Sequence, residues 1–170
     1  MASASQLHRS TAARIVGALI LAAAMVAACG GAGAGSADPG RDAYRSRVCS
    51  AIVGLADNAT DFKTIRSAQD VATGLAALER VIDRSTKAST DLRSAGAAWE
   101  PGRAIATELA TSMAGLASMS ADLKAGLTGG DVSSWTTFTT RYATWYADTT
   151  AIASKDTSAL TALGVSCPAP

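Results

Sequence analysis

Four stretches of this chain carry apolar residues at intervals of three and four positions, and this period limits the fold more than any other feature. Side chains at that spacing lie on one face of an α-helix, whereas a half-buried strand requires alternation by two. The sequence therefore predicts four helices, over about residues 41–58, 67–96, 101–128 and 131–163. Amphipathic helices joined by short connections pack together, so we expect an all-α fold, an up-down-up-down four-helix bundle.

The connection between the first two helices is expected at residues 57–66. Phe62 and Ile65 are apolar residues of this connector, and we expect them to pack beneath the bundle. Ser67 begins the second helix in this interpretation. Together with Asp70 three residues later, Ser67 resembles a capping box, in which side chains at a helix start accept hydrogen bonds from free backbone N–H groups.

Glycine and proline mark the boundaries in the second half of the chain. Trp99-Glu100-Pro101-Gly102 predicts the turn into the third helix, because proline is tolerated near the first helical position. The pair Gly129-Gly130 predicts the end of that helix, and Asp131 is expected to cap the fourth. Gly164 predicts where the fourth helix stops.

The fourth predicted helix carries a stripe of large side chains at helical spacing. Its members are Trp135, Phe138, Tyr142, Trp145, Thr149 and Ile152. Two interpretations stay open. Large aromatic side chains can fill the centre of a bundle that is otherwise rich in alanine and serine. Alternatively, Trp135, Tyr142 and Trp145 line a pocket between helices for a lipid or another small apolar ligand.

The N-terminal stretch has the layout of a secretory signal. Residues 1–14 contain Arg9 and Arg14 but no acidic residue, and residues 15–28 are uncharged and mostly apolar. A membrane-spanning helix needs about 20 apolar residues, and this run is shorter. The stretch therefore predicts a cleaved signal peptide over residues 1–28.

The last residues of that signal, Val26-Ala27-Ala28-Cys29, resemble the lipobox of bacterial lipoproteins. In layout, the whole chain resembles small lipoproteins of actinobacteria. The resemblance implies cleavage before Cys29, which then carries a diacylglyceryl group and a fatty acid such as palmitate. The mature protein would be lipid-anchored on the extracytoplasmic side of the cell membrane. Residues 29–40 would form the lipidated cysteine and a flexible linker, and residues 41–170 the helical domain.

Two further cysteines remain once Cys29 is assigned to lipid. Cys49 and Cys167 make an even pair in a compartment where disulfides persist, so we expect them to be bonded to each other. An up-down-up-down bundle brings the start of its first helix and the end of its last helix to the same end. The expected disulfide is therefore compatible with the predicted topology.

Charge and composition argue against several functional classes. Loss of residues 1–28 removes Arg9 and Arg14 and leaves 13 of the 15 basic residues against 14 acidic ones, so we expect no nucleic-acid partner. The one histidine of the chain, His8, lies in the same removed segment. Without an imidazole, no metal-ligand cluster and no pairing of a nucleophile with a base can be recognised. We expect no catalytic residue, no metal and no cofactor.

These inferences lead to a general function. The sequence predicts a lipid-anchored extracytoplasmic helical protein that acts as a non-catalytic interaction or accessory module of the cell envelope, with the membrane and an envelope protein as partners. The alternative is a lipoprotein that binds a small ligand or a lipid in a pocket between its helices.

Overall fold

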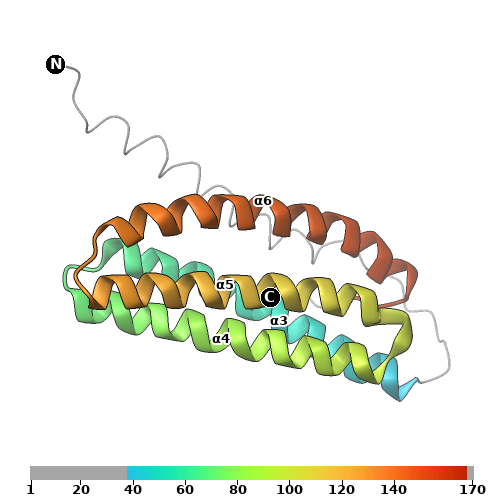
Figure 1. Ribbon diagram of the computed structural model, residues 1–170. Coiled ribbons are helices and arrows are strands. Elements are labelled where there is room, and N and C mark those ends of the chain that lie inside the picture. The colour runs from blue at the N-terminus through green and yellow to red at the C-terminus, as the bar shows by residue number, and fades with distance from the viewer. Residues whose placement is uncertain (1–37, 168–170) are drawn as a thin grey trace.

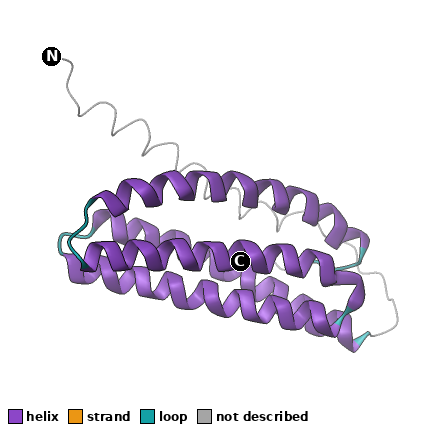
Figure 2. Cartoon of the chain, in the orientation of Figure 1, coloured by secondary structure: helices purple, strands orange, loops and turns teal. Residues whose placement is uncertain are grey.

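The computed structural model describes residues 38–167, which form four antiparallel α-helices (Figure 1). Their bounds are Pro39–Ser67 for α3, Val71–Ala98 for α4, Arg103–Thr128 for α5 and Ser133–Ala162 for α6. The short 3-10 helix η1, Glu100–Gly102, joins α4 to α5. Within residues 38–167 there is no strand (Figure 2). The predicted all-α, up-down-up-down bundle is confirmed.

The first described helix begins two residues before its predicted start at residue 41. Pro39 occupies the first turn of α3, where its missing N–H costs no hydrogen bond. The Asp38 carboxylate caps this turn by accepting hydrogen bonds from the backbone N–H groups of Gly40, at 2.9 Å, and Arg41, at 3.3 Å. The predicted signal peptide and Cys29 lie outside the described residues.

The predicted connector at residues 57–66 is wrong, because α3 continues without a break to its end at Ser67. Two of its polar residues, Asn58 and Asp61, are buried, and both form hydrogen bonds with α4. The Asp61 carboxylate, 6% exposed, accepts hydrogen bonds from Arg80 at 2.6 Å and from Arg84 at 3.0 Å. Phe62 is buried, as expected, but from within the helix. Partners on the neighbouring helix therefore let a polar segment remain helical and buried.

The predicted start of the second helix is also corrected. Ser67 ends α3, and its hydroxyl donates back to the carbonyl of Lys63 at 3.0 Å. Asp70 caps α4 instead, accepting from the backbone N–H of Thr73 at 2.8 Å. Val71, the first residue of α4, is 67% exposed.

The boundaries predicted from glycine and proline in the second half are confirmed. The turn at residues 99–102 contains η1, and α5 ends just before Gly129. Gly130 adopts a φ of 79°, a left-handed conformation that favours glycine. Asp131 accepts a hydrogen bond at 2.9 Å from the backbone N–H of Ser133, the first residue of α6.

The buried side chains form two clusters along the bundle. One lies toward η1 and includes Tyr44, whose hydroxyl donates to the carbonyl of Gly102 at 3.0 Å. A Cβ atom at Gly102 would lie 2.4 Å from the Tyr44 ring, so this contact requires glycine. The second cluster contains Phe62, Phe138 and Tyr142 and lies toward the opposite end. Each of the two core clusters therefore contains aromatic side chains.

Cys49 of α3 is bonded to Cys167, with their Cα atoms 5.3 Å apart, and the predicted disulfide is confirmed. Val165, two residues before Cys167, is buried in the cluster nearest η1. The segment after α6 is therefore attached to α3 both covalently and by packing.

The last helix, α6, packs differently from the other three. Its backbone runs close to α5, whereas α3 and α6 are held farther apart than any sequential pair of helices. Phe62 extends from α3 toward α6, and its ring centroid lies 5.9 Å from that of Phe138 and 5.1 Å from that of Tyr142. Large aromatic side chains therefore fill the space between α3 and α6.

Threonine hydroxyls on α6 bond back to the helix itself. The donors to carbonyls four residues earlier include Thr140, Thr144, Thr150 and Thr157. Such bonds compete with the helical ladder and tend to bend helices. Figure 1 shows α6 arched, with its convex side away from the other helices.

Candidate ligand cavity between α5 and α6

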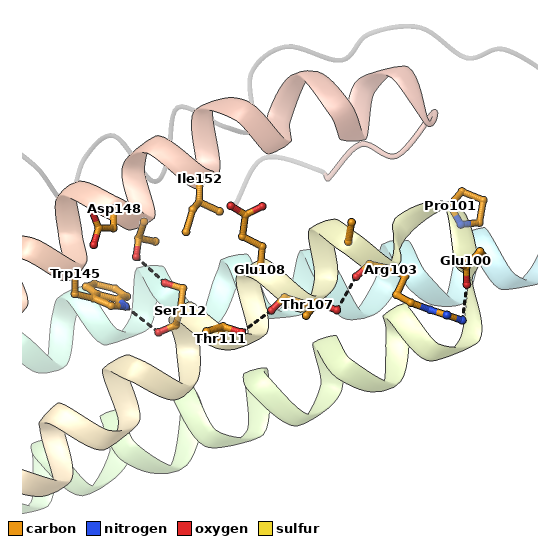
Figure 3. A pocket seen from close by; sticks show the side chains of 12 residues that line it. Glu100, Pro101, Arg103, Thr107, Glu108, Thr111, Ser112, Trp145, Asp148 and Ile152 are labelled. Carbon is orange, nitrogen blue, oxygen red and sulfur yellow. Dashed lines mark hydrogen bonds and ion pairs between the residues drawn. The ribbon is translucent and has the colours of Figure 1, made fainter.

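A cavity of about 710 Å³, open to solvent and lined mostly by exposed residues, lies between α5 and α6, in the half of the bundle nearer to η1 (Figure 3). Its lining comes from the start of α5, the turn before it and the middle of α6. The lining residues are Glu100, Pro101, Arg103, Ala104, Thr107, Glu108, Thr111, Ser112, Trp145, Asp148, Thr149 and Ile152.

One end of this cavity is formed by Trp145, which is held in place by α5. Its indole N–H donates to the backbone carbonyl of Ser112 at 2.8 Å, and the Ser112 hydroxyl hydrogen-bonds to the Thr149 hydroxyl at 2.6 Å (Figure 3). Both bonds connect α5 with α6. The indole therefore has a fixed orientation at the cavity wall.

The charged side chains of the lining are mainly acidic. Glu100 forms an ion pair with Arg103, and Glu108 accepts a hydrogen bond from Lys155 at 2.5 Å. The bond to Glu108 is the main reason that the pKa of Lys155 is raised. Asp148 has no ion-pair partner within residues 38–167. Carboxylates thus enter the cavity from both α5 and α6.

A fourth carboxylate, that of Asp156, lies buried one turn beyond the cavity-lining residue Ile152 on α6. Asp156 is 2% exposed, and neither of its oxygens has a hydrogen-bond partner in the described part of the chain. The nearest cation is Lys155, whose Nζ is 4.0 Å from Oδ1. Burial raises the pKa of Asp156, and the negative charge of Glu108 raises it further. The molecule therefore holds an almost unpaired carboxyl group beside the cavity.

Of the three residues predicted to line a pocket, Trp145 lines this cavity and the other two do not. Tyr142 is 6% exposed and packs in the core, where burial is the main cause that raises its pKa to about 12. Trp135 packs against the same cluster, with its ring centroid 5.9 Å from that of Phe138. The aromatic stripe is therefore core at its beginning and cavity wall at Trp145.

Sequence reasoning missed Glu108 and Asp156. The signal for Asp156 was present, because Thr149, Ile152 and Asp156 continue the same helical stripe from Trp145 at spacings of four, three and four. A charged residue on an apolar face indicates either a buried polar group or a site.

Membrane-spanning helices and metal-ligand clusters are the other features that would bear on function. Between residues 38 and 167 no helix has both the length and the hydropathy that a membrane span requires. In the same range no three His, Cys, Asp or Glu side chains gather as metal ligands would. Comparisons of the chain with protein-family models, curated proteins and solved structures found no significant match.

Proposed function

We propose that this protein is a lipid-anchored, extracytoplasmic helical protein that binds a small ligand in the cavity between α5 and α6 without catalysing a reaction. The observation that carries the proposal is the cavity of about 710 Å³ with the indole of Trp145 fixed at its wall. Ligand pockets typically measure about 300–1,000 Å³ and combine apolar walls with a few oriented polar groups. The α5–α6 cavity has the volume and the mixture of surfaces of such a site.

The absence of catalysis in this proposal is supported by the hydroxyl groups of the cavity. A serine or threonine nucleophile needs a neighbouring base. Within the described residues, Ser112 and Thr149 bond to each other, and the Thr107 and Thr111 hydroxyls bond to backbone carbonyls of α5. These hydroxyls therefore serve packing and helix contacts. The interaction-module role expected from the sequence stays a prediction.

The membrane anchor in this proposal is supported by the lipobox residues and by the short distance along the chain from Cys29 to Pro39, where α3 begins. We expect Cys29→Ser to abolish lipidation, so that the protein leaves the membrane fraction or stays unprocessed. Cell fractionation and intact mass measure both results, and Cys49→Ser, which removes a disulfide cysteine, serves as the cysteine control. Unchanged membrane attachment of Cys29→Ser would contradict the anchor.

Ligand binding is tested by filling the cavity. Thr107 is exposed and lines the cavity, and its hydroxyl donates to the backbone carbonyl four residues earlier. Thr90 on α4 is also exposed and makes the same kind of hydrogen bond, but it does not line the cavity. We expect native mass spectrometry of the protein to show a bound small molecule that is lost in Thr107→Trp and retained in Thr90→Trp, because only the first indole occupies the cavity. Equal retention by both variants would place the ligand elsewhere. A protein without any adduct that captures an envelope protein instead would favour the interaction module.

A further inference from the structure

The N–H donors among the residues that line the α5–α6 cavity already have partners within the protein. The indole N–H of Trp145 donates to the backbone carbonyl of Ser112 at 2.8 Å. Arg103 donates to the carbonyl of Gly96 at 3.4 Å and forms an ion pair with Glu100. A ligand in this cavity therefore meets few donors that are ready to bind it.

Hydrogen-bond acceptors, in contrast, come from both walls of the cavity. On α5, the exposed hydroxyls of Thr107 and Thr111 each donate to the carbonyl four residues earlier, and a hydroxyl oxygen that donates its hydrogen keeps its lone pairs (Figure 3). On α6, the carboxylate of Asp148 is exposed and has no ion-pair partner within residues 38–167. The cavity therefore presents oxygen acceptors that extend over one turn of α5 and across to α6.

This distribution of acceptors selects among ligand classes. An anionic ligand would be repelled by the Asp148 carboxylate, and a purely apolar ligand would remove water from the acceptors without replacing its hydrogen bonds. An ammonium group carries all its donors at one point, whereas the acceptors are spread over two helices. The matching ligand is neutral and carries several hydroxyl donors around its edge.

Trp145 adds an apolar surface beside these acceptors. It precedes Asp148 by three residues on α6, so the two side chains share one face of the helix, and both line the cavity. The face of an aromatic ring is negative and attracts C–H groups. A pyranose ring has C–H groups on its faces and hydroxyl groups around its edge, which is the combination that this wall requires. Because the cavity is open to solvent, the hydroxyl groups of the sugar that face outward keep their water.

We propose that the α5–α6 cavity binds a neutral sugar, with a pyranose ring stacked on Trp145 and its hydroxyl groups donating to Asp148 and to the threonine oxygens of α5. This ligand class rests on the ligand-binding function proposed above. A hydrogen bond to a carboxylate is stronger than one to a neutral oxygen, so Asp148 is the main polar contact. The same chemistry is offered by a free sugar and by one unit of a glycan chain.

Four disaccharides serve as probes for the full-length oxidised protein at pH 7: maltose, cellobiose, lactose and trehalose. A cationic ligand, 2-phenylethylamine, and an anionic apolar ligand, octanoate, serve as comparisons. We expect at least one disaccharide to bind at least tenfold more tightly than either comparison ligand in calorimetry. It should also shift the indole N–H resonance of Trp145, while those of Trp99 and Trp135, which do not line the cavity, serve as internal references.

Two pairs of variants assign the polar contacts. We expect Asp148→Asn to weaken binding of that disaccharide at least fivefold, and Asp83→Asn, at an exposed aspartate of α4 outside the cavity, to leave it unchanged. Thr111→Val should weaken binding at least twofold and Thr90→Val should not, although both changes remove the same kind of hydroxyl bond to the helix. Unchanged affinity in Asp148→Asn would overturn the assignment of Asp148.

Failure of the sugar class can be distinguished from failure of the ligand cavity. If none of the four disaccharides binds, the sugar class is overturned, while a natural adduct lost in Thr107→Trp would still support the cavity. Equal or tighter binding of 2-phenylethylamine or octanoate, with a shift at Trp145, would also overturn the sugar class and leave a ligand cavity. Loss of both results would remove both proposals.

The length of the sugar separates its two sources. Longer oligomers of the disaccharide that binds are measured in the same way. An affinity that rises with chain length assigns the cavity to a glycan chain, and a constant affinity assigns it to a free sugar.

Discussion

Removal of the Cys49–Cys167 disulfide should lower the free energy of unfolding by about 2–5 kcal/mol, the range observed when native disulfides are removed from small domains. The two cysteines are 118 residues apart, so the bond closes nearly the whole described chain into a loop and strongly restricts the unfolded state. Urea denaturation under oxidising and reducing conditions measures the difference. The double variant Cys49→Ser/Cys167→Ser should match the reduced protein.

The loss should be uneven along the bundle. α4 packs closely against both α3 and α5, whereas α6 has a close backbone neighbour only in α5 among the described helices. Without the disulfide, the end of α6 is held by Leu160 and Val165 in the cluster near η1. Hydrogen exchange should therefore accelerate most in the last turns of α6 and least in α4. A uniform acceleration, or an unchanged urea midpoint on reduction, would contradict this expectation.

Asp156→Asn should stabilise the protein at pH 8, because it removes a buried negative charge that has no hydrogen-bond partner and only the Lys155 cation nearby, at 4.0 Å. The pKa of Asp156 is raised above 3.8 in the folded protein, mainly by burial. As the pH rises above about 3.8, the unfolded chain releases this proton before the folded chain does. Folded-state stability is therefore lost between pH 3.8 and the raised pKa, and stays lost above it.

This expectation is checked by measuring how the difference in unfolding free energy between Asp156→Asn and the parent protein changes with pH. The stability gained by Asp156→Asn should be small near pH 4 and should grow toward pH 8. Other carboxylates titrate as well: hydrogen bonds at helix starts lower the pKa values of Asp38, Asp70 and Asp131. These effects cancel in the difference between variant and parent. Asp83→Asn, on the exposed face of α4, is the control and should change little at either pH. A gain that is equal at both pH values would rule out the ionisation of Asp156 as its cause.

The parts of the fold that depend on local chemistry could be predicted from the sequence. The turn at residues 99–102 and the stop at Gly129 contain residues whose backbone preferences act within a few positions, and both were located correctly. The end of α3 depends on distant residues. Asn58 and Asp61 look like loop residues until Arg84 of α4 provides hydrogen bonds to both. The sequence of residues 57–66 alone cannot show this, because the hydrogen-bond partners lie on another helix.

The candidate site shows the same division. The helical spacing of the aromatic residues could predict which face of α6 Trp145 occupies, and that face borders the cavity. The period could not show that Tyr142 lies in the core and Trp145 at a cavity, since this depends on the distance between α5 and α6. The burial of Asp156 likewise depends on neighbouring helices: its charge raises the pKa of Tyr44 on α3, and the charge of Glu108 on α5 raises its own pKa.

The attachment of α6 has a mechanical consequence for the cavity. One end of this helix is joined to α5 through the short turn at residues 129–132, and the other is fixed to α3 by the disulfide. Both ends of α6 are therefore held, and the hydrogen bonds of Trp145 and Thr149 attach its middle to α5. The threonine hydroxyls that bond to α6 carbonyls lie along this middle part. Because the disulfide is the covalent attachment at the far end of α6, we expect its reduction to leave that end of the helix held by packing alone.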